Sequence, residues 1–382
     1  MTFRIALLLA SLLAIPVHAQ PPDPYPHDDV LRLNHAQAIG THNSYHLRSP
    51  LYPKGPPHDF DYEHAPLDVQ LGEQGVRKFE LDVYWDQDLG VFRVHHENFF
   101  DQNPSCSTLV LCLEILRDWS LAHRDHHPVF VMIEPKGIYY PSTLSDEPIC
   151  DPPQHTVCHY DDLDAEIRSV LAPPAGTNLL ITPDEVRGAR TTLREAVLQD
   201  GWPTLRATRG RFLVAMLDSG FDRDSYTAEH PTLEGRAMFV NSTPDLDYAA
   251  VMMRDDPIGN LAWIQDRVAE GYVIRTRADA LDDAQANDTT RRDAAFASGA
   301  NYISTDYPVP EYLDNGYFAQ VPGGTPSRCN PVSAMGLECT SPDIEDGVAV
   351  PEPAALALGF TAIAAIASLG RRRLRDRLAM SA

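Results

Sequence analysis

Six polar side chains stand at the ends of short apolar stretches in the first third of the chain, and their types suit one another chemically. They are His42, Asn43, Glu80, Asp82, His95 and Glu134. Carboxylate and amide oxygens are the ligands that a hard cation such as Ca²⁺ prefers. Imidazoles titrate near neutral pH and can therefore exchange protons with a substrate. The set predicts a calcium site flanked by two histidines, which is chemistry suited to cleaving a phosphodiester.

Alternation along the strands decides which of these side chains share a face. Glu80 and Asp82 are two residues apart, so both point the same way, while the apolar residues around them point to the other face. Glu134 ends an apolar stretch, where an unpaired charge would be costly and a cation is a natural partner. The same alternation favours His95 over the adjacent His96 as the imidazole directed toward the carboxylates.

Stretches typical of strands and of helices alternate between residues 31 and 318, which favours a parallel sheet covered on both faces. We expect eight strands, at Gln37–His42, Arg77–Val83, Val91–His95, Val129–Glu134, Phe212–Leu217, Ala237–Asn241, Tyr272–Thr276 and Tyr302–Thr305. This number predicts an α/β fold with a single (β/α)8 TIM-type barrel in residues 30–320. The active site of such a barrel lies at the carboxyl ends of its strands, where the six polar residues stand.

Two observations qualify this barrel. The long segment 137–211 fits the alternation poorly, so we expect a loop insertion there that distorts the barrel and carries a short extra strand at Leu179–Thr182. A doubly wound open sheet is the structural rival. It is less favoured because no Gly-x-Gly-x-x-Gly motif follows the first strand.

Both ends of the chain carry segments typical of export. Residues 1–19 read as a secretory signal peptide, with one arginine, an apolar run and a small-residue cleavage site. Residues 351–377 run from Pro-Glu-Pro through an apolar stretch to a group of arginines, and they resemble the PEP-CTERM sorting signal of Gram-negative bacteria. That resemblance implies an exosortase-like peptidase as partner and a location in the periplasm, at the cell surface or outside the cell. A single-pass anchor is the alternative, and residues 321–350 are expected to be a spacer.

The six cysteines fall as three near neighbours in the sequence: Cys106 with Cys112, Cys150 with Cys158, and Cys329 with Cys339. Short intervening segments and an oxidising compartment favour these local disulfides. No Cys-x-x-Cys occurs, which argues against a zinc or redox site.

Charge restricts the partners of the chain. Its 31 basic and 54 acidic residues give a net charge of -23. A nucleic-acid partner is therefore not expected, because such binding depends on neutralising phosphates with Lys and Arg. An anionic membrane would also repel the chain unless a cation bridges the two. We expect a monomer.

Four motifs, taken together and in order, resemble the catalytic region of the calcium-dependent phosphoinositide phospholipases C. They are Ile39-Gly40-Thr41-His42-Asn43-Ser44-Tyr45, Glu80-Leu81-Asp82, Val94-His95 and Ile133-Glu134. Two later segments, 273–279 and 298–308, resemble the last two strands of the secreted bacterial members. The resemblance runs from His35 to Pro308.

The resemblance implies a role for each residue of the set. The ligands of Ca²⁺ would be Asn43, Glu80, Asp82 and Glu134. The substrate would be a phosphatidylinositol-type phospholipid at a membrane surface, cleaved to diacylglycerol and an inositol phosphate. His42 or a ligand carboxylate would take the proton of the inositol 2-hydroxyl, and His95 would protonate the leaving oxygen. His96 stands where the eukaryotic members carry Gly, so it is the less favoured catalyst.

Four further positions have weaker claims on the substrate. Lys136 could hold a phosphate or pair with a neighbouring carboxylate. Arg275 or Arg277 could contact an inositol phosphate or hydroxyl. Asp306 could bind the first histidine or a substrate hydroxyl, and Tyr307 could stack on the inositol ring.

Two other functions stay open. A glycerophosphodiester phosphodiesterase uses the same kind of barrel, but that group usually begins with a His-Arg-Gly strand end, and this chain has His42-Asn43-Ser44. A non-catalytic, surface-displayed binding protein would be expected to have lost ligands or histidines. All six positions are filled, which favours the enzyme.

Overall fold

The computed structural model describes residues 23–48, 62–97, 101–136, 146–147, 149–150, 157–323 and 326–346. The expected signal segment, residues 1–19, and the expected sorting segment, residues 351–377, lie outside the described residues. Among the residues that are described, none belongs to a helix long and apolar enough to cross a membrane.

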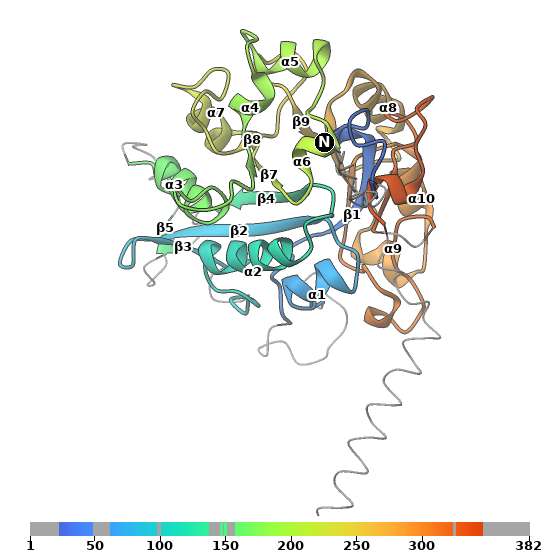
Figure 1. Ribbon diagram of the computed structural model, residues 1–382. Coiled ribbons are helices and arrows are strands. Elements are labelled where there is room, and N and C mark those ends of the chain that lie inside the picture. Colours follow the sequence, from blue (N-terminus) through green and yellow to red (C-terminus); the bar gives the residue numbers. More distant parts are fainter. Residues whose placement is uncertain are drawn as a thin grey trace, which may run out of the picture.

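Within these residues, eight parallel strands follow one another around an α/β barrel (Figure 1). In ring order they are β1 (Ala36–Thr41), β2 (Lys78–Asp86), β4 (Val129–Pro135), β7 (Phe212–Met216), β8 (Phe239–Val240), β9 (Val251–Met253), β10 (Val273–Arg277) and β11 (Tyr302–Thr305). The first and last strands pair through Ala38 and Tyr302. One bridge, Asn241 with Val251, joins β8 to β9. The predicted TIM-type barrel is confirmed. It is distorted where only one bridge joins two neighbouring strands.

The junction between β1 and β2 is also a single bridge, Gly40 with Lys78. A Cβ on Gly40 would lie 2.4 Å from the Cβ of Lys78, a distance that real Cβ atoms do not show. The backbones can therefore approach here only because residue 40 is glycine. This contact matters because β1 and β2 carry most of the polar residues singled out in the sequence.

Apolar strands build the interior. All residues of β7 are buried, and in β4 only Glu134 is partly exposed. Strands of a parallel sheet covered on both faces need such continuous apolar runs. Burying one Leu, Ile or Phe side chain stabilises the fold by about 1.5–3 kcal/mol. The barrel core thus fixes the strand ends on which the polar residues stand.

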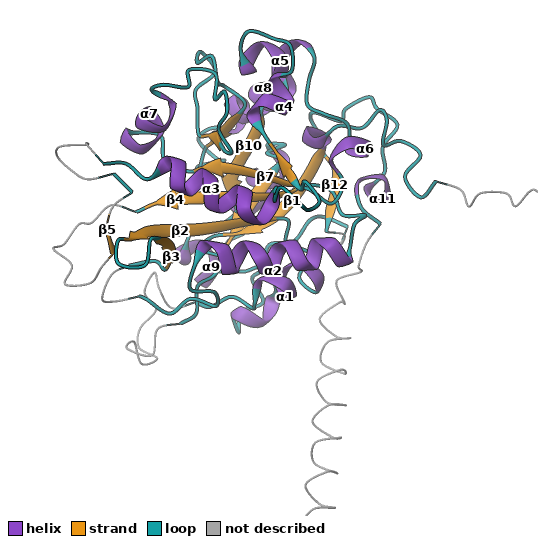
Figure 2. Cartoon of the chain, turned by 60° about the vertical axis from the view of Figure 1, so that its left-hand side comes forward, coloured by secondary structure: helices purple, strands orange, loops and turns teal. Residues whose placement is uncertain are grey.

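Helices surround the strands, and Figure 2 shows α2 and α3 close together on the outside of the sheet. The helices are α1 (Leu67–Gly72), α2 (Leu109–Ala122), α3 (Tyr160–Leu171), α4 (Pro183–Arg187), α5 (Leu193–Gln199), α6 (Leu205–Thr208), α7 (Phe221–Thr227), α8 (Leu261–Glu270), α9 (Leu281–Gln285), α10 (Thr290–Ala297) and α11 (Ser341–Ile344), with 3₁₀ turns η1 (Leu33–His35) and η2 (Pro310–Tyr312). The Thr108 side chain accepts a hydrogen bond from the backbone N–H of Leu111 and so caps α2. Gly271, with φ 110°, ends α8 in the left-handed region that glycine adopts most easily.

One expected strand does not belong to the barrel, and one barrel strand was not expected. The stretch predicted at Val91–His95 is β3 (Val91–Val94), which pairs antiparallel with β2 and is not a barrel strand. The turn between β2 and β3 is too short for the crossover that a parallel strand needs, so the chain must return antiparallel. The barrel strand that the sequence did not reveal is β9, whose three residues are too few to show a pattern.

Three short strands complete the sheet. The extra strand expected at Leu179–Thr182 is present as β6 (Leu180–Ile181), which pairs with the start of β7. β5 (Asp146–Glu147) pairs antiparallel with the end of β2. β12 (Ser327–Cys329) pairs antiparallel with β1.

Much of the expected spacer, residues 321–350, belongs to the folded body. Beyond β12 the chain forms α11, and Glu345 then accepts hydrogen bonds from the buried guanidinium of Arg77. The spacer prediction therefore fails over residues 327–346, because strand pairing, a disulfide and a buried ion pair hold them to the barrel. The disulfides expected at 106–112, 150–158 and 329–339 are all present.

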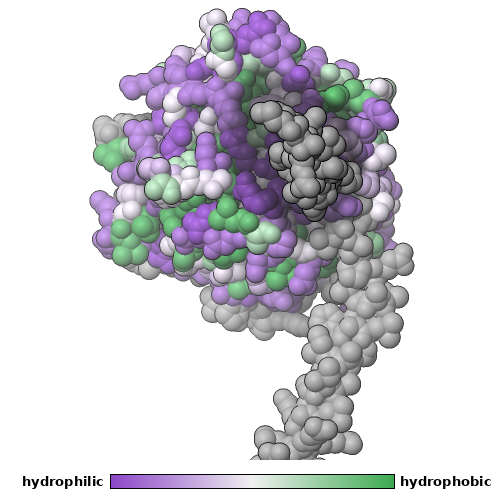
Figure 3. Space-filling view, in the orientation of Figure 1, coloured by the Kyte–Doolittle hydropathy of each residue, from purple (hydrophilic) through white to green (hydrophobic). Residues whose placement is uncertain are grey.

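The surface agrees with the composition. The face shown in Figure 3 is largely hydrophilic, with separate apolar patches. Exposed apolar side chains such as Leu111 and Leu121 of α2, at 46% and 45% exposure, are ordinary for a folded surface.

Candidate active site

Three carboxylates meet at the carboxyl ends of β2 and β4. Glu80 and Asp82 share one face of β2, as alternation predicted, and Asp82 lies opposite Glu134 in the parallel register. One oxygen from each of the three lies within 4.8 Å of the others. A cluster of this kind at the catalytic end of a barrel can hold a metal ion.

Asn43 supplies an amide oxygen beside this cluster. Its neighbour Ser44 exchanges two hydrogen bonds with the backbone of Glu80, at 2.8 and 2.9 Å, which ties the turn after β1 to β2. Asn43 has φ 44°, a left-handed conformation that Asn tolerates better than most residues. Its Nδ2 donates to the hydroxyl of Tyr62 at 3.0 Å.

Two buried oxygens point to a missing partner. Oδ1 of Asn43 and Oδ1 of Asp82 have no hydrogen-bond partner among the described residues. Buried polar atoms normally have hydrogen-bond partners. Two oxygens without one, at a cluster of three carboxylates to which Asp82 itself belongs, indicate a site for a cation. An all-oxygen set of carboxylates and an amide fits Ca²⁺.

The charges within the cluster are unevenly balanced. Burial alone would raise the pKa of Glu80, but the charges of Lys78 and Arg275 outweigh it and hold this pKa below its ordinary value. Their nitrogens lie 2.5 and 3.2 Å from Glu80 Oε2. Burial and the charge of Asp82 instead raise the pKa of Glu134 to about 7. A bound cation would relieve this repulsion.

Lys136 stands between the two less compensated carboxylates. Its Nζ lies 2.9 Å from an oxygen of Asp82 and 2.9 Å from an oxygen of Glu134. Of the two alternatives drawn from the sequence, the described structure shows the carboxylate pair. Arg275 is likewise buried in ion pairs, with Glu80 and Asp255, and does not line the cavity beside the cluster.

That cavity has a volume of about 350 Å³ and opens next to the carboxylates. Its walls come from the loops after β1, β3, β10 and β11. The lining residues are His42, Tyr62, His96, Arg277, Ala280, Leu281, Asp306 and Tyr307. Tyr307, predicted to stack on a substrate ring, is therefore on the cavity wall, where it packs edge-on against Tyr317.

His42 forms a pair with Asp306 on one side of the cavity. Its Nδ1 donates to Asp306 Oδ1 at 2.9 Å, and its Nε2 lies 3.6 Å from Glu80 Oε1. Of the two predicted roles of Asp306, the contact with the histidine is the one present. Burial, followed by the charge of Arg277, lowers the pKa of His42 below its ordinary value. His42 is therefore suited to accept a proton.

His96 forms a second pair, with Asp101. Its Nδ1 lies 3.0 Å from Asp101 Oδ2, and the same oxygen is 2.6 Å from His46 Nε2. Burial works to lower the pKa of His96, but the hydrogen bond to Asp101 and the charge of Asp82 outweigh it and raise this pKa. His96 is therefore suited to carry a proton that it can donate.

The structure corrects the register expected for the two adjacent imidazoles. His96 lines the cavity, whereas His95 is 2% exposed and stacks on the ring of Tyr84, with 4.2 Å between ring centroids. The reason is that β3 ends at Val94, so strand alternation no longer governs the two positions that follow.

Two residues at the site escaped the sequence analysis. Asp101 and His46 stand in loops, without a motif or period that would mark them. The only available signal was the density of His and Asp in the loops that follow β1 and β3.

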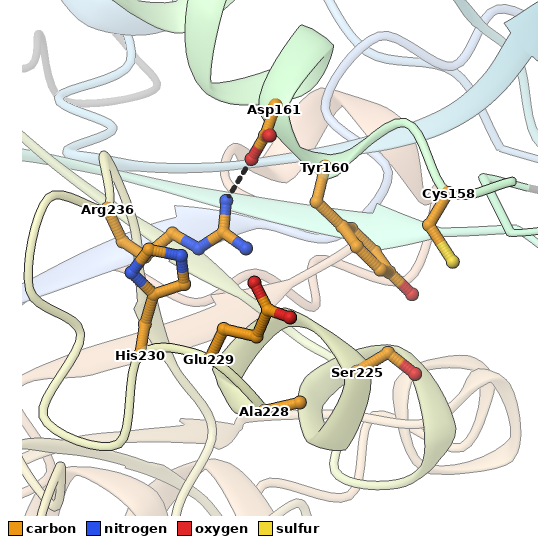
Figure 4. A pocket seen from close by; sticks show the side chains of 8 residues that line it. All are labelled: Cys158, Tyr160, Asp161, Ser225, Ala228, Glu229, His230 and Arg236. Atoms are coloured by element: carbon orange, nitrogen blue, oxygen red, sulfur yellow. Dashed lines mark hydrogen bonds and ion pairs between the residues drawn. The ribbon is translucent and has the colours of Figure 1, made fainter.

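A second cavity of similar volume, about 350 Å³, lies between the start of α3 and the end of α7 (Figure 4). Figure 4 shows the guanidinium of Arg236 turned toward Asp161, which accepts its hydrogen bond at 2.6 Å. A second carboxylate, Asp164, and the ring of Tyr226 also contact this guanidinium. The charge of Arg236 is thus already neutralised. The cluster of three carboxylates found among the described residues, Glu80, Asp82 and Glu134, does not line this cavity.

Comparison with known families decides the class of this site. The chain matches the family described as "Phosphoinositide phospholipase C, Ca2+-dependent" over residues 31–100 and 88–331. The chain belongs to this family. It is accordingly a phosphoric diester hydrolase of a calcium-dependent family, and its acidic cluster is where the described residues could hold the ion. No match was found among curated protein sequences.

Solved structures with TM-scores above 0.5 support the fold of this family member. A calcium-dependent phosphoinositol-specific phospholipase C from the Gram-negative bacterium Pseudomonas sp., in its apo form, is 17% identical with a TM-score of 0.54, and the match covers 81% of this chain and 100% of that one. Its myoinositol complex gives 17% identity and a TM-score of 0.53, with the same coverage. A Ca²⁺-dependent phosphatidylinositol-specific enzyme from Streptomyces antibioticus is 19% identical over 73% of this chain and 96% of that one, with a TM-score of 0.49.

Proposed function

We propose that this chain cleaves phosphatidylinositol-type phospholipids to diacylglycerol and an inositol phosphate, with Ca²⁺ as cofactor. The observation that carries the proposal is the cavity beside the carboxylate cluster, lined by the histidines of two histidine–aspartate pairs. A solved relative of the same fold binds myoinositol. The family itself acts on phosphoinositides, as its description states.

The proton movements follow from the two pairs. His42 accepts the proton of the inositol 2-hydroxyl at Nε2, while its Nδ1–H stays on Asp306. The hydroxyl oxygen attacks phosphorus, the bond from phosphorus to the diacylglycerol oxygen breaks, and His96 gives that oxygen a proton. The first product on the inositol side is then a cyclic phosphate diester. In this proposal His96 takes the role that the sequence had favoured for His95.

Asn43, Glu80, Asp82 and Glu134 are the proposed ligands of the cofactor. When bound, Ca²⁺ supplies charge neutralisation for the phosphate and lowers the pKa of the attacking hydroxyl. Lys78 and Arg275 hold Glu80 ionised and fixed, which keeps this carboxylate available as a ligand. Arg277 lines the cavity and is placed to contact phosphate or a ring hydroxyl, in preference to Arg275.

Release of inositol phosphate from phosphatidylinositol vesicles tests the proposal directly. We expect release by the purified chain with Ca²⁺, and loss of release when a chelator is added. Glycerophosphoinositol and phosphatidylcholine serve as control substrates. Turnover of the deacylated substrate alone would favour the glycerophosphodiester alternative, and no turnover of any substrate would favour the binding protein.

We also propose that the chain is exported and that residues 351–377 are processed by an exosortase-like peptidase. The apolar run within residues 1–19 and the Pro-Glu-Pro segment with its arginines support this proposal. The three disulfides suit an oxidising compartment. Mass spectrometry of the mature protein from cell-surface and periplasmic fractions should find both segments removed; an intact chain in the cytoplasm would contradict it.

A further inference from the structure

A short hydrogen-bond chain links the loop after β3 to the turn after β1. Asp101 Oδ2 accepts from His96 Nδ1 at 3.0 Å and from His46 Nε2 at 2.6 Å. Asp101 and His46 are each 1% exposed, so water does not compete for these bonds. His46 belongs to the same turn as Asn43, whose carbonyl oxygen accepts the backbone N–H of His46 at 2.8 Å.

The protonation of this chain follows from its partners. A carboxylate accepts and does not donate, so both imidazole nitrogens that face Asp101 carry a hydrogen. The other nitrogen of His46, Nδ1, is buried and has no hydrogen-bond partner among the described residues. The hydrogen of His46 that Asp101 accepts is therefore on Nε2.

His46 is also held in place by packing. Its ring stacks on Tyr62 with 4.4 Å between centroids and 25° between planes. Tyr62 in turn accepts the hydrogen bond from Asn43 Nδ2. His46, which supports Asp101, therefore belongs to the same turn that presents the proposed amide ligand. Its position does not depend on the loop that carries His96.

We propose that Asp101 is a positioning residue for departure of the leaving group, with His46 as its fixed support. Asp101 holds one hydrogen of His96 on Nδ1, so the proton that is transferred is the one on Nε2 of this cavity-lining imidazole. This inference rests on the proposed function, because it assigns a partner to the proton donor of that reaction.

The step balances as follows. The bond between phosphorus and the diacylglycerol oxygen breaks, and the oxygen keeps the electron pair and takes the proton from His96 Nε2. His96 is left neutral, with its remaining hydrogen on Nδ1 and the hydrogen bond to Asp101 intact. If Asp101 could not accept that hydrogen bond, neutral His96 could place its hydrogen on either nitrogen and its ring could turn.

Asp101→Asn is a sharp test because it keeps the shape of the loop. The backbone N–H groups of His96 and Glu97 donate to the backbone oxygen of Asp101 at 3.2 Å, and the substitution leaves these bonds in place. Both histidines donate to the same oxygen, Oδ2, so an amide oxygen in its place can accept both hydrogen bonds, but without the negative charge that strengthens them. The substitution therefore weakens the hold on His96 Nδ1 while it conserves the shape of the site.

Two substrates distinguish a positioning role of Asp101 from a purely structural one. The diacylglycerol of phosphatidylinositol would leave as an alkoxide and needs a proton. The p-nitrophenol of an aryl ester of inositol phosphate leaves as a stable phenolate and needs none. For Asp101→Asn we expect kcat to fall about 100-fold or more on the lipid and less than about fivefold on the aryl ester, the size of effect that general-acid catalysis has. His96→Ala should show the same selectivity, and the double variant should be no worse than His96→Ala alone.

A matched control lies on the same hairpin. Asp86 is also a buried carboxylate, and it accepts from the backbone N–H groups of Asp88 and Leu89 in the turn between β2 and β3. Asp86→Asn should affect both substrates equally. Equal loss on both substrates for Asp101→Asn, or no loss on either, would overturn the inference. Failure of the wild-type chain to cleave phosphatidylinositol would instead overturn the proposed function.

A second measurement needs no variant. Nitrogen NMR of the labelled histidines in the wild-type chain reports which ring nitrogen carries hydrogen. We expect His46 with hydrogen on Nε2 and His96 with hydrogen on Nδ1. A neutral His96 with its hydrogen on Nε2 would contradict the inference even if Asp101→Asn failed to fold.

Discussion

The two histidine–aspartate pairs use the same side chains in opposite settings. His42 with Asp306 lies beside the guanidinium of Arg277, and burial together with that charge lowers the pKa of the imidazole. His96 with Asp101 lies beside the carboxylate of Asp82, and the pKa of its imidazole is raised. Two groups of one chemical type are thus prepared for opposite directions of proton transfer by the charges around them.

The largest test of this comparison removes each imidazole in turn. His42→Ala should lower kcat about 10²–10⁴-fold, the usual range for general acid–base catalysis, on both phosphatidylinositol and the aryl ester, because both need the 2-hydroxyl to lose a proton. His96→Ala should be as damaging only on the lipid. Steady-state kinetics with the two substrates measures both effects. If the two variants had the same profile, the pairs would not divide the roles of base and acid.

A smaller test changes the charge next to His42. The base must be neutral, so activity falls as the pH drops through its pKa. Arg277→Met removes a cation that lowers this pKa, which should move the acidic limb of the kcat/KM profile to higher pH by about one unit. The alkaline limb, set by His96, should stay in place. Arg292→Met removes a cation that does not line the cavity and is the control. An equal movement of both limbs would break the comparison.

Lys136 allows a similar test on the other side of the cluster. It pairs with Asp82 and Glu134, so Ca²⁺ must compete with an ammonium for the same oxygens. Lys136→Met should tighten Ca²⁺ binding by about tenfold, a typical coupling between two charged partners of one site. Isothermal titration of the protein with Ca²⁺ measures this directly. Weaker binding would show that Lys136 supports the ligands more than it competes with the ion.

The smallest expected effect concerns His95. Its stacking on Tyr84 is preserved by another aromatic ring, so His95→Phe should leave kcat on phosphatidylinositol within about twofold of wild type, as surface and packing changes that conserve volume usually do. His96→Phe is the matched variant and should be severely impaired. The reverse ranking would restore the register first expected from the sequence.

The parts of the site predictable from sequence are those that a strand dictates. Glu80 and Asp82 lie in β2, whose alternation over nine residues leaves little choice of face. Glu134 follows an apolar run that is recognisable without a structure. The barrel followed from the same pattern with two exceptions: β3, which was expected as a barrel strand but pairs antiparallel with β2, and β9, where Val251–Met253 are too few residues to carry a period.

Loop residues could not be placed in this way. His96 is oriented by Asp101 and His46, and the distance of 55 residues between those two leaves no local signal. The error at His95 arose because alternation was extended past Val94, where the ladder with β2 ends. Residues 327–346 have the composition of a linker, yet the partners that order them, such as Arg77 and Glu345, lie far apart in the sequence.

The contact between Arg77 and Glu345 has a further consequence. Arg77 directly precedes β2, and the backbone N–H of His127, just before β4, also donates to Glu345. Glu345 thus sits at the amino ends of the strands, whereas the cavity opens at their carboxyl ends. The described residues end one position later, at Asp346. A tether joined there would hold the barrel by its base and turn the catalytic mouth away from the surface of attachment.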